Sequence, residues 1–253
     1  MSKELRKALS ILTKVLCLGL LVVGCTSVEV PATNNAAANL TAKVQPEAAL
    51  HPKRANFEGE SKSRDVQNMA DWVVDSGDNG GTPFVIIDKV DARVFVFGAD
   101  GRLRGAAPAL LGLAKGDDTI PGIGNRKLSS IRPEERTTPA GRFVASLGHN
   151  FKGKDVLWVD YSDALSLHRV IPVKPRLASL DTPTPLDNRM SFGCINVPAK
   201  FYDTVVKPVF TGTRGIVYIL PEVRSKKEIF ASYYDIESRA EHARQQTSTS
   251  RQQ

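Results

Sequence analysis

Short runs of apolar, β-branched and aromatic residues recur through the middle of the chain, with polar turns between them. These runs are FVIID (84–88), RVFVFG (93–98), GRFVASLG (141–148), VLWVDYS (156–162), LSLHRV (165–170) and GIVYIL (215–220). Runs of this kind, bounded by Gly, Asp or Pro, are typical of β-strands. The segment RLRGAAPALLG (102–112) can supply a further strand. The pattern therefore predicts a mostly β fold with a sandwich or barrel-like body.

Helical spacing is found in only a few places. Before the first strand, apolar residues recur at i, i+3, i+4 and i+7 behind a serine that can cap a helix: Ser63, Val66, Met69, Ala70 and Val73. The segment PAKFYDTVV (198–206) predicts a second helix, with Pro198 at its first position. Residues 222–246 are charged and predict a surface helix, and TSTSRQQ (247–253) predicts a disordered tail.

Two long stretches lack a strand or helix pattern and are expected to be loops. Residues 114–140 are rich in Gly, Pro and charge, and residues 171–189 are rich in Pro. Loops of this length in a compact domain are more often functional than idle. They lie on either side of the central strands, and we expect them to contribute to function.

The N-terminus has the pattern of an export signal. A basic start, MSKELRK, precedes the apolar run VLCLGLLVV (15–23), which is too short to span a membrane comfortably. The run ends in VVGC (22–25), similar to a bacterial lipobox, so residues 1–24 are interpreted as a signal peptide and Cys25 as a lipidated residue. An ordinary signal peptide with an incidental Cys25 is the alternative. Both predict export to the bacterial periplasm or cell envelope, and the first adds a lipid anchor in the membrane.

The rest of the chain divides by composition. Residues 25–60 are rich in Ala, Asn, Thr and Pro without periodicity, which predicts a flexible linker. An N-terminal helix and lead-in follow at 61–82, then the main domain at 83–221 and the charged C-terminal segment at 222–253.

The charge of the chain argues against nucleic acid as a partner. The net charge is +7, but the first 24 residues carry +3, which leaves +4 for the exported part. This mild excess suits acidic substrates or envelope polymers, and no nucleic-acid-binding motif is present.

Cysteine usage points to chemistry in the main domain. Of three cysteines, Cys17 and Cys25 belong to the signal region, so Cys194 is the single thiol of the exported domain. A single unpaired cysteine in an exported protein suggests a reactive thiol. The alternative is a buried cysteine that only fills space.

A reactive cysteine needs a lowered pKa, which a histidine, a cation or a helix N-terminus can provide. In MSFGCINVP (190–198), Gly193 allows an unusual backbone angle, and a helix is expected to begin near Pro198. The backbone N–H groups of Gly193 and Cys194 could form an oxyanion hole. Arg189 adds a nearby cation.

The general base must come from one of four histidines. His51 lies in the linker and His242 in the tail, so neither is well placed. His168 ends the apolar strand LSLHRV and is the favoured base. His149, in the hairpin loop LGHNFKG, is the reserve candidate.

Two segments resemble the L,D-transpeptidase catalytic domain (YkuD-type). SFGCIN (191–196) is similar to the family signature Ser/Thr-His-Gly-Cys-x-Asn/Arg, and TTPAGRF (137–143) to the family's Thr-Pro-x-Gly-x-Phe segment. FVIIDKVDARVFVF (84–97) matches the hairpin that opens the family's domain. The resemblance covers about residues 83–221 and implies an L,D-transpeptidase-like β-sandwich or barrel-like body with a few short helices.

The resemblance also implies roles for individual residues. Cys194 matches the nucleophile, His168 the base, and Ser191, Gly193 and Asn196 the flanking motif positions. Two features depart from the family pattern. Phe192 stands where the motif has a histidine, which is not the general base. In addition, 26 residues separate His168 from Cys194, and the excess, PRLASLDTPTPLDNR, is interpreted as a loop inserted over the active site.

The implied reaction is acyl transfer on peptidoglycan stem peptides, which would be the partner of the domain. The Cys194 thiolate attacks the third stem residue, D-alanine leaves, and an amine of another stem resolves the thioester to a 3→3 cross-link. Three arginines are candidates for binding stem carboxylates: Arg142, Arg169 and Arg189. No cofactor and no metal is implied.

Three other functions remain open. Water as acceptor would make an L,D-carboxypeptidase, and a protein amine or amide would make an enzyme that attaches or detaches envelope proteins. The third is a lipoprotein that binds the cell wall without catalysis.

Overall fold

A computed structural model describes residues 51–250 of the chain. The predicted signal peptide, Cys25, most of the predicted linker and residues 251–253 lie outside these described residues. No helix within residues 51–250 combines the length and hydrophobicity needed to cross a lipid bilayer.

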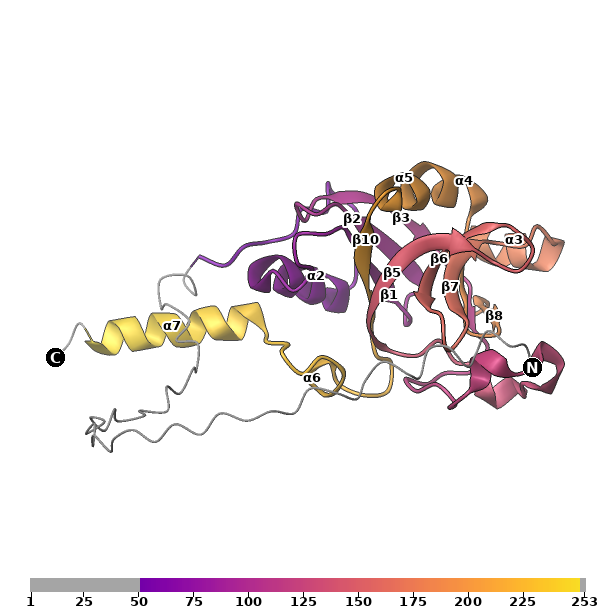
Figure 1. Cartoon of the computed structure of the whole chain (residues 1–253). Coiled ribbons are helices and arrows are strands. Elements are labelled where there is room, and N and C mark those ends of the chain that lie inside the picture. The colour runs from indigo at the N-terminus through magenta and orange to yellow at the C-terminus, as the bar shows by residue number, and fades with distance from the viewer. Residues whose placement is uncertain (1–50, 251–253) are drawn as a thin grey trace, which may run out of the picture. The chain divides into compact units, whose positions relative to one another are not determined.

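Eight strands form one mixed sheet, so the prediction of a mostly β fold is confirmed (Figure 1). Their order is β3-β2-β1-β10-β5-β6-β7-β9. The strands are β1 (Phe84–Asp88), β2 (Arg93–Phe97), β3 (Leu103–Pro108), β5 (Gly141–His149), β6 (Asp155–Asp160), β7 (Leu165–Arg169), β9 (Ile195–Val197) and β10 (Arg214–Ile219). A separate parallel pair joins β4 (Leu111–Gly112) to β8 (Arg189–Ser191).

The two edges of the large sheet meet through the segment that follows β3. Leu110 and Asn196 exchange two backbone hydrogen bonds, of 2.8 and 2.9 Å, which join this segment to β9. The sheet therefore curls into a nearly closed, barrel-like body, with the segments around Cys194 at its seam.

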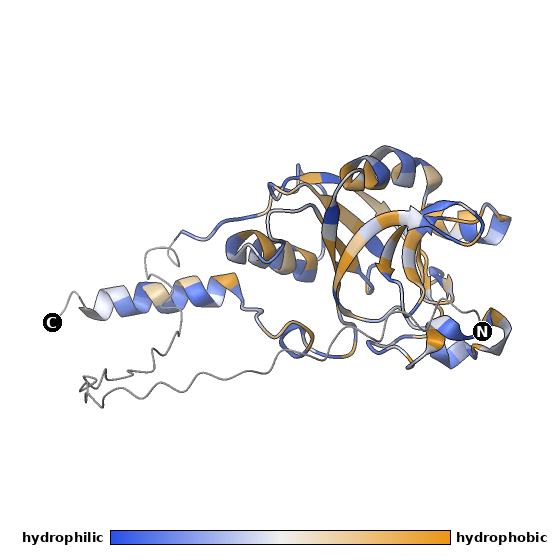
Figure 2. Ribbon diagram, in the orientation of Figure 1, coloured by the Kyte–Doolittle hydropathy of each residue, from blue (hydrophilic) through white to orange (hydrophobic). Residues whose placement is uncertain are grey.

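Alternation along the strands builds two cores. In β1, Val85 and Ile87 lie in an interior cluster, whereas Phe84 and Ile86 lie in a cluster on the opposite face. All four side chains are fully buried, which explains why FVIID is a continuous apolar run rather than an alternating one. Figure 2 shows hydrophobic residues along the strands of the sheet.

Helix α2 (Arg64–Ser76) covers the second cluster. The Ser63 hydroxyl accepts from the Val66 N–H, so Ser63 caps the helix as predicted. Gly77, in the left-handed region at φ 69°, ends it.

The C-terminal segment packs on the same cluster. It contains α6 (Lys226–Ile229) and α7 (Ile236–Ser250), and contributes the buried residues Phe230, Tyr233 and Ile236. Helix α7 includes residues 247–250, so this part of the tail predicted to be disordered is helical.

Both predicted loops contain helical turns. Residues 114–140 include the 3-10 helices η2 (Ile123–Asn125), η3 (Leu128–Ser130) and η4 (Pro133–Glu135). The expectation of a loop at 171–189 is wrong for its central part, which forms α3 (Lys174–Asp181) (Figure 1). Pro175 lies in the first turn of α3, where a missing N–H does not interrupt the helix.

A helical segment follows β9, as PAKFYDTVV predicts. It consists of α4 (Ala199–Phe201), the π-helical η5 (Tyr202–Val206) and α5 (Lys207–Phe210). Pro198 is the residue before the first turn, rather than the first helical residue as predicted.

Candidate active site

Four polar side chains share one face of the sheet at β7 and β9. The two strands are parallel, and His168 pairs with Asn196 in their register. Leu167, Ile195 and Val197 lie in the interior cluster, and successive side chains of a strand point to opposite faces. The residues between them therefore lie together on the other face: Ser166, His168, Cys194 and Asn196.

The Cys194 thiol lies beside the start of β7. Its Sγ donates to the Ala164 carbonyl at 3.4 Å and lies 3.6 Å from the Ser166 hydroxyl oxygen. Cys194 is half-buried and forms no disulfide. The thiol is therefore held in place while remaining partly accessible from solvent.

The electrostatics of the thiol are set by His168. Burial alone would raise the pKa of Cys194, but hydrogen bonding and charge interaction with His168 outweigh it and lower that pKa. Burial alone would lower the pKa of His168, but the interaction with Cys194 outweighs it and raises that pKa. Opposite shifts in a neighbouring thiol and imidazole favour the thiolate–imidazolium pair.

The orientation of the imidazole follows from its second hydrogen bond. His168 Nδ1 lies 2.7 Å from the Arg169 carbonyl oxygen. A carbonyl only accepts, so Nδ1 carries a proton, and Nε2 remains for the exchange with Cys194. His149, the reserve candidate, is exposed at the end of β5, with β6 between it and β7, and makes no contact with Cys194 within the described residues.

Two motif residues fix the backbone of Cys194. The Ser191 hydroxyl donates to the Cys194 carbonyl at 2.7 Å, and the Asn196 side-chain amide donates to the same oxygen at 3.0 Å. Both residues are buried, so the two bonds are shielded from water. The carbonyl is held from the protein side, which fixes the peptide that carries the thiol.

Gly193 is required by a close backbone contact. Its φ is +130°, and a Cβ at this position would lie 2.7 Å from the Thr137 carbonyl oxygen. The buried Thr138 hydroxyl donates to the Gly193 carbonyl at 2.7 Å and accepts from the Gly112 N–H at 2.8 Å. The two segments that resemble the family, TTPAGRF and SFGCIN, are therefore in direct contact.

The expected oxyanion hole and helix N-terminus need correction. The Gly193 N–H donates to the Ser191 hydroxyl at 3.0 Å, so it is not free to bind an oxyanion in this conformation. The helix begins at Ala199, after β9, so its N-terminus is not at the thiol. Of the expected donors and cations near Cys194, the N–H of Cys194 itself remains a candidate.

Each of the three arginines expected to bind substrate has a carboxylate partner in the fold. Arg142 binds Asp78 at 2.6 Å, Arg189 binds Glu222 at 2.5 Å, and Arg169 binds both Asp155, at 3.0 Å, and Asp203. Their guanidinium groups join distant segments of the fold.

Two other arginines lie closer to the motif, and sequence reasoning missed both. The Arg136 guanidinium stacks on the Phe192 ring, with its Cζ 4.1 Å from the ring centroid. Arg176 of α3 donates to the Asn196 side-chain oxygen and to the Met190 carbonyl, each at 3.0 Å. Ser166 was also missed, although its position two residues before His168 on one strand would have indicated a shared face.

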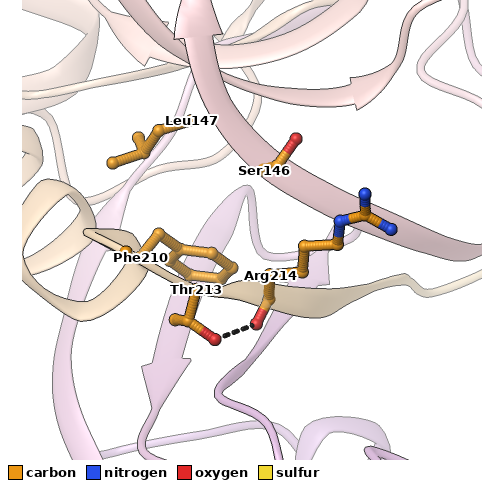
Figure 3. Close-up of a pocket in the computed structure, with 6 residues that line it drawn as sticks. Ser146, Leu147, Phe210, Thr213 and Arg214 are labelled. Carbon is orange, nitrogen blue, oxygen red and sulfur yellow. Dashed lines mark hydrogen bonds between the residues drawn. The ribbon is translucent and has the colours of Figure 1, made fainter.

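A separate hollow lies away from these groups. It has a volume of about 280 Å³ and is lined by Ser146, Leu147, Phe210, Gly212, Thr213 and Arg214 (Figure 3). The lining contains no cysteine, histidine or carboxylate, so it lacks the groups for cysteine acyl transfer. Within residues 51–250, no group of three or more His, Cys, Asp or Glu side chains is placed to hold a metal ion.

Comparison with known proteins gives distant likenesses. No family model and no curated protein matches the sequence. Among solved structures, the fold is similar to an L,D-transpeptidase from Stackebrandtia nassauensis (14% identity, TM-score 0.32), the catalytic domain of the E. faecium L,D-transpeptidase (19%, 0.30) and an L,D-transpeptidase from Mycobacterium smegmatis (15%, 0.31).

Each alignment covers 55% of this chain, and respectively 55%, 98% and 58% of the other. The matched part therefore spans little more than half of two of these proteins and almost all of the isolated catalytic domain. Likenesses at this distance assign no activity to the chain, so its function rests on the chemistry of the site.

Proposed function

We propose that the chain is an exported cysteine acyltransferase of the L,D-transpeptidase type that acts on peptidoglycan stem peptides. The observation that carries this proposal is the placement of Cys194 and His168 on one face of β7 and β9, where the pKa of the thiol is lowered and that of the imidazole is raised. The contact between TTPAGRF and SFGCIN through Thr138 and Gly193 adds support, because the resemblance rests on these two segments.

The first half-reaction forms a thioester. The Cys194 thiolate attacks the carbonyl carbon of the third stem residue, and the negative charge moves to the carbonyl oxygen. The Cys194 N–H is the proposed donor to this oxygen. When the tetrahedral intermediate collapses, the C–N bond breaks and the His168 imidazolium gives its proton to the leaving amine of D-alanine.

The second half-reaction reverses these roles. His168, now neutral, accepts a proton from the attacking side-chain amine of another stem, and the amine nitrogen bonds to the thioester carbon. The C–S bond breaks and the thiolate returns, paired with the imidazolium. A thioester suits this two-step reaction because it reacts readily with an amine and lasts long enough for that amine to compete with water.

The proposed setting is the bacterial cell envelope. The export signal over residues 1–24 and lipidation of Cys25 would tether the domain to the membrane and place it beside its polymer substrate. The linker before the domain would let the domain reach peptidoglycan at a distance from the membrane.

Product analysis tests this proposal. The full chain, in mild detergent, is incubated with purified disaccharide-tetrapeptide, beside the variants Cys194→Ala and His168→Ala. His149→Ala serves as the matched histidine control, because His149 is exposed and makes no contact with the thiol. Mass spectrometry follows the muropeptides.

A cross-linked dimer that has lost one D-alanine, present with the wild type and His149→Ala but absent with Cys194→Ala, is the expected result. Tripeptide alone would mean that water is the acceptor and that the enzyme is an L,D-carboxypeptidase. Unchanged substrate in every reaction would contradict the enzyme and leave a wall-binding protein.

A further inference from the structure

Arg176 is presented to the active site by the inserted helix α3. Leu180, one turn later on the same side of the helix, is buried against Leu110 and Val170 and anchors α3 to the seam of the sheet. Arg176 is half-buried, and its guanidinium reaches Asn196, which pairs with His168 across β7 and β9.

The Arg176 guanidinium has no carboxylate partner within residues 51–250. Only two of its five N–H donors meet acceptors there, and both acceptors are neutral oxygens, on Asn196 and Met190. Arg142, Arg169 and Arg189 each pair with at least one carboxylate. The other three N–H donors of Arg176 are therefore available to an anionic ligand.

We propose that Arg176 binds the carboxylate of the amino acid that leaves during acylation, and so selects donors that end one residue after the scissile bond. This inference rests on the proposed function, because it assigns a substrate group to the same site. It makes Arg176 a specificity residue supplied by the insertion.

The position of the leaving group follows from the role of His168. The imidazolium protonates the leaving amine, so that amine must lie at the imidazole. In a C-terminal amino acid, the carboxylate is attached to the carbon next to the amine. The carboxylate therefore falls within a few bonds of His168, where the Arg176 charge already acts on the imidazole.

The guanidinium is chemically suited to this carboxylate. It is planar and can offer two parallel N–H donors. It therefore binds a carboxylate more strongly than it binds a neutral amide. A longer donor places a peptide group at this point, and an amidated donor places a neutral carboxamide there. Both would leave the Arg176 charge uncompensated.

The test compares two donors with three proteins. The donors are the disaccharide-tetrapeptide with a free C-terminal carboxylate and the same molecule with a C-terminal amide. The proteins are the full-length wild type, Arg176→Gln and Lys174→Gln. Lys174→Gln removes the same charge from an exposed position of the same helix, where the side chain makes no contact with the site. The rate of Cys194 thioester formation is measured by intact-protein mass.

With the wild type and Lys174→Gln, the free-acid donor should react roughly 10- to 100-fold faster than the amide, as expected for a hydrogen-bonded charge pair. Arg176→Gln should lose most of this preference by slowing the free-acid donor much more than the amide donor. Arg176→Lys keeps the positive charge but lacks the two parallel N–H donors of the guanidinium, and it should recover part of the preference. A purely structural role would slow both donors equally and leave their ratio unchanged.

Two results would overturn the inference. If the wild type reacts equally with both donors, Arg176 does not bind the donor carboxylate selectively, although the proposed function stands. The same conclusion follows if Arg176→Gln keeps the wild-type ratio. If the wild type reacts with neither donor, the proposed function itself fails and the inference fails with it. The wild-type comparison needs no variant, so the inference can be refuted even if Arg176→Gln does not fold.

Discussion

At the scale of residues, His168 is the main neighbour that favours ionisation of Cys194. Neither the helix N-terminus nor Arg189 supplies a positive charge to the thiol, because β9 separates the thiol from the helix and Arg189 binds Glu222. Burial opposes ionisation of Cys194, and its interaction with His168 is the larger effect that lowers the pKa of the thiol, with a smaller contribution from Ser166. The reactivity of the thiol should therefore depend strongly on one imidazole.

Alkylation by iodoacetamide as a function of pH measures this dependence. We expect the wild-type thiol to react with an apparent pKa below that of an ordinary cysteine, because His168 favours the thiolate. In His168→Gln the opposing effect of burial remains, so the apparent pKa should rise above that of an ordinary cysteine and the rate near neutral pH should fall. His149→Gln should follow the wild-type curve. A wild-type curve centred at or above the ordinary value would contradict the pairing.

The sequence was informative about which residues carry chemistry and less so about what they contact. Cys194 follows from its being a lone thiol and His168 from its place at the end of an apolar strand, and the structure brings the two together. The arginine partners depend on distant segments, such as Arg189 with Glu222, and no local pattern encodes them. The same holds for the Gly193 N–H, whose bond to Ser191 depends on the curvature of the motif.

At the scale of elements, the long loop at 114–140 is anchored by a buried ion pair. Lys89 Nζ donates to the Asp117 carboxylate at 2.8 Å, and both side chains are buried. The same carboxylate accepts from the backbone N–H groups of Glu222, Val223 and Arg224. The loop that leads into TTPAGRF is thereby tied to the segment after β10.

Asp117→Asn should weaken this anchor severely. It leaves the Lys89 charge buried without its closest carboxylate, so we expect the free energy of unfolding to fall by about 3 to 5 kcal/mol. Asp118→Asn is the matched control, because its carboxylate is exposed and pairs only with Arg224; about 0.5 kcal/mol or less is expected. Urea denaturation measures both. Equal, small losses would show that the ion pair does not hold the loop.

The pH dependence of stability should have a definite sign. Burial would raise the pKa of Asp117, but the Lys89 hydrogen bond and the backbone donors lower it from 3.8 to about 2. A carboxylate with a lower pKa in the folded state stabilises the protein above the unfolded value and loses this contribution as the pH falls towards the folded value. The stability gap between wild type and Asp117→Asn should therefore be full at pH 6 and shrink as the pH approaches about 2.

The sequence predicts an element well when the element is long and when neighbouring residues, rather than tertiary contacts, stabilise it. The strands of five or more residues follow the apolar pattern closely, and α2 follows its spacing and its serine cap. Strands β8 and β9 have three residues each, too few for a period to be seen. Helix α3 was missed because Pro175 and the surrounding prolines indicate a loop, whereas burial of Leu180 stabilises the helix through tertiary contact.

At the scale of the whole molecule, the site forms where four distant segments meet at the seam of the curled sheet. Strand β7 brings His168, the motif brings Cys194, the long loop brings Thr138, and α3 brings Arg176. The bonds between Leu110 and Asn196 close this seam. The fold thus places the thiol and the imidazole together at this seam.

The central claim is that Cys194 forms a thioester with a stem peptide. The most direct measurement is the intact mass of the full-length protein after brief mixing with the disaccharide-tetrapeptide, at a pH where the thiol alkylates. The account predicts an adduct equal to the donor minus alanine, located on Cys194 by peptide mapping and absent from Cys194→Ala. An alkylatable Cys194 that gains no such mass at saturating donor, or an adduct at another residue, would contradict it.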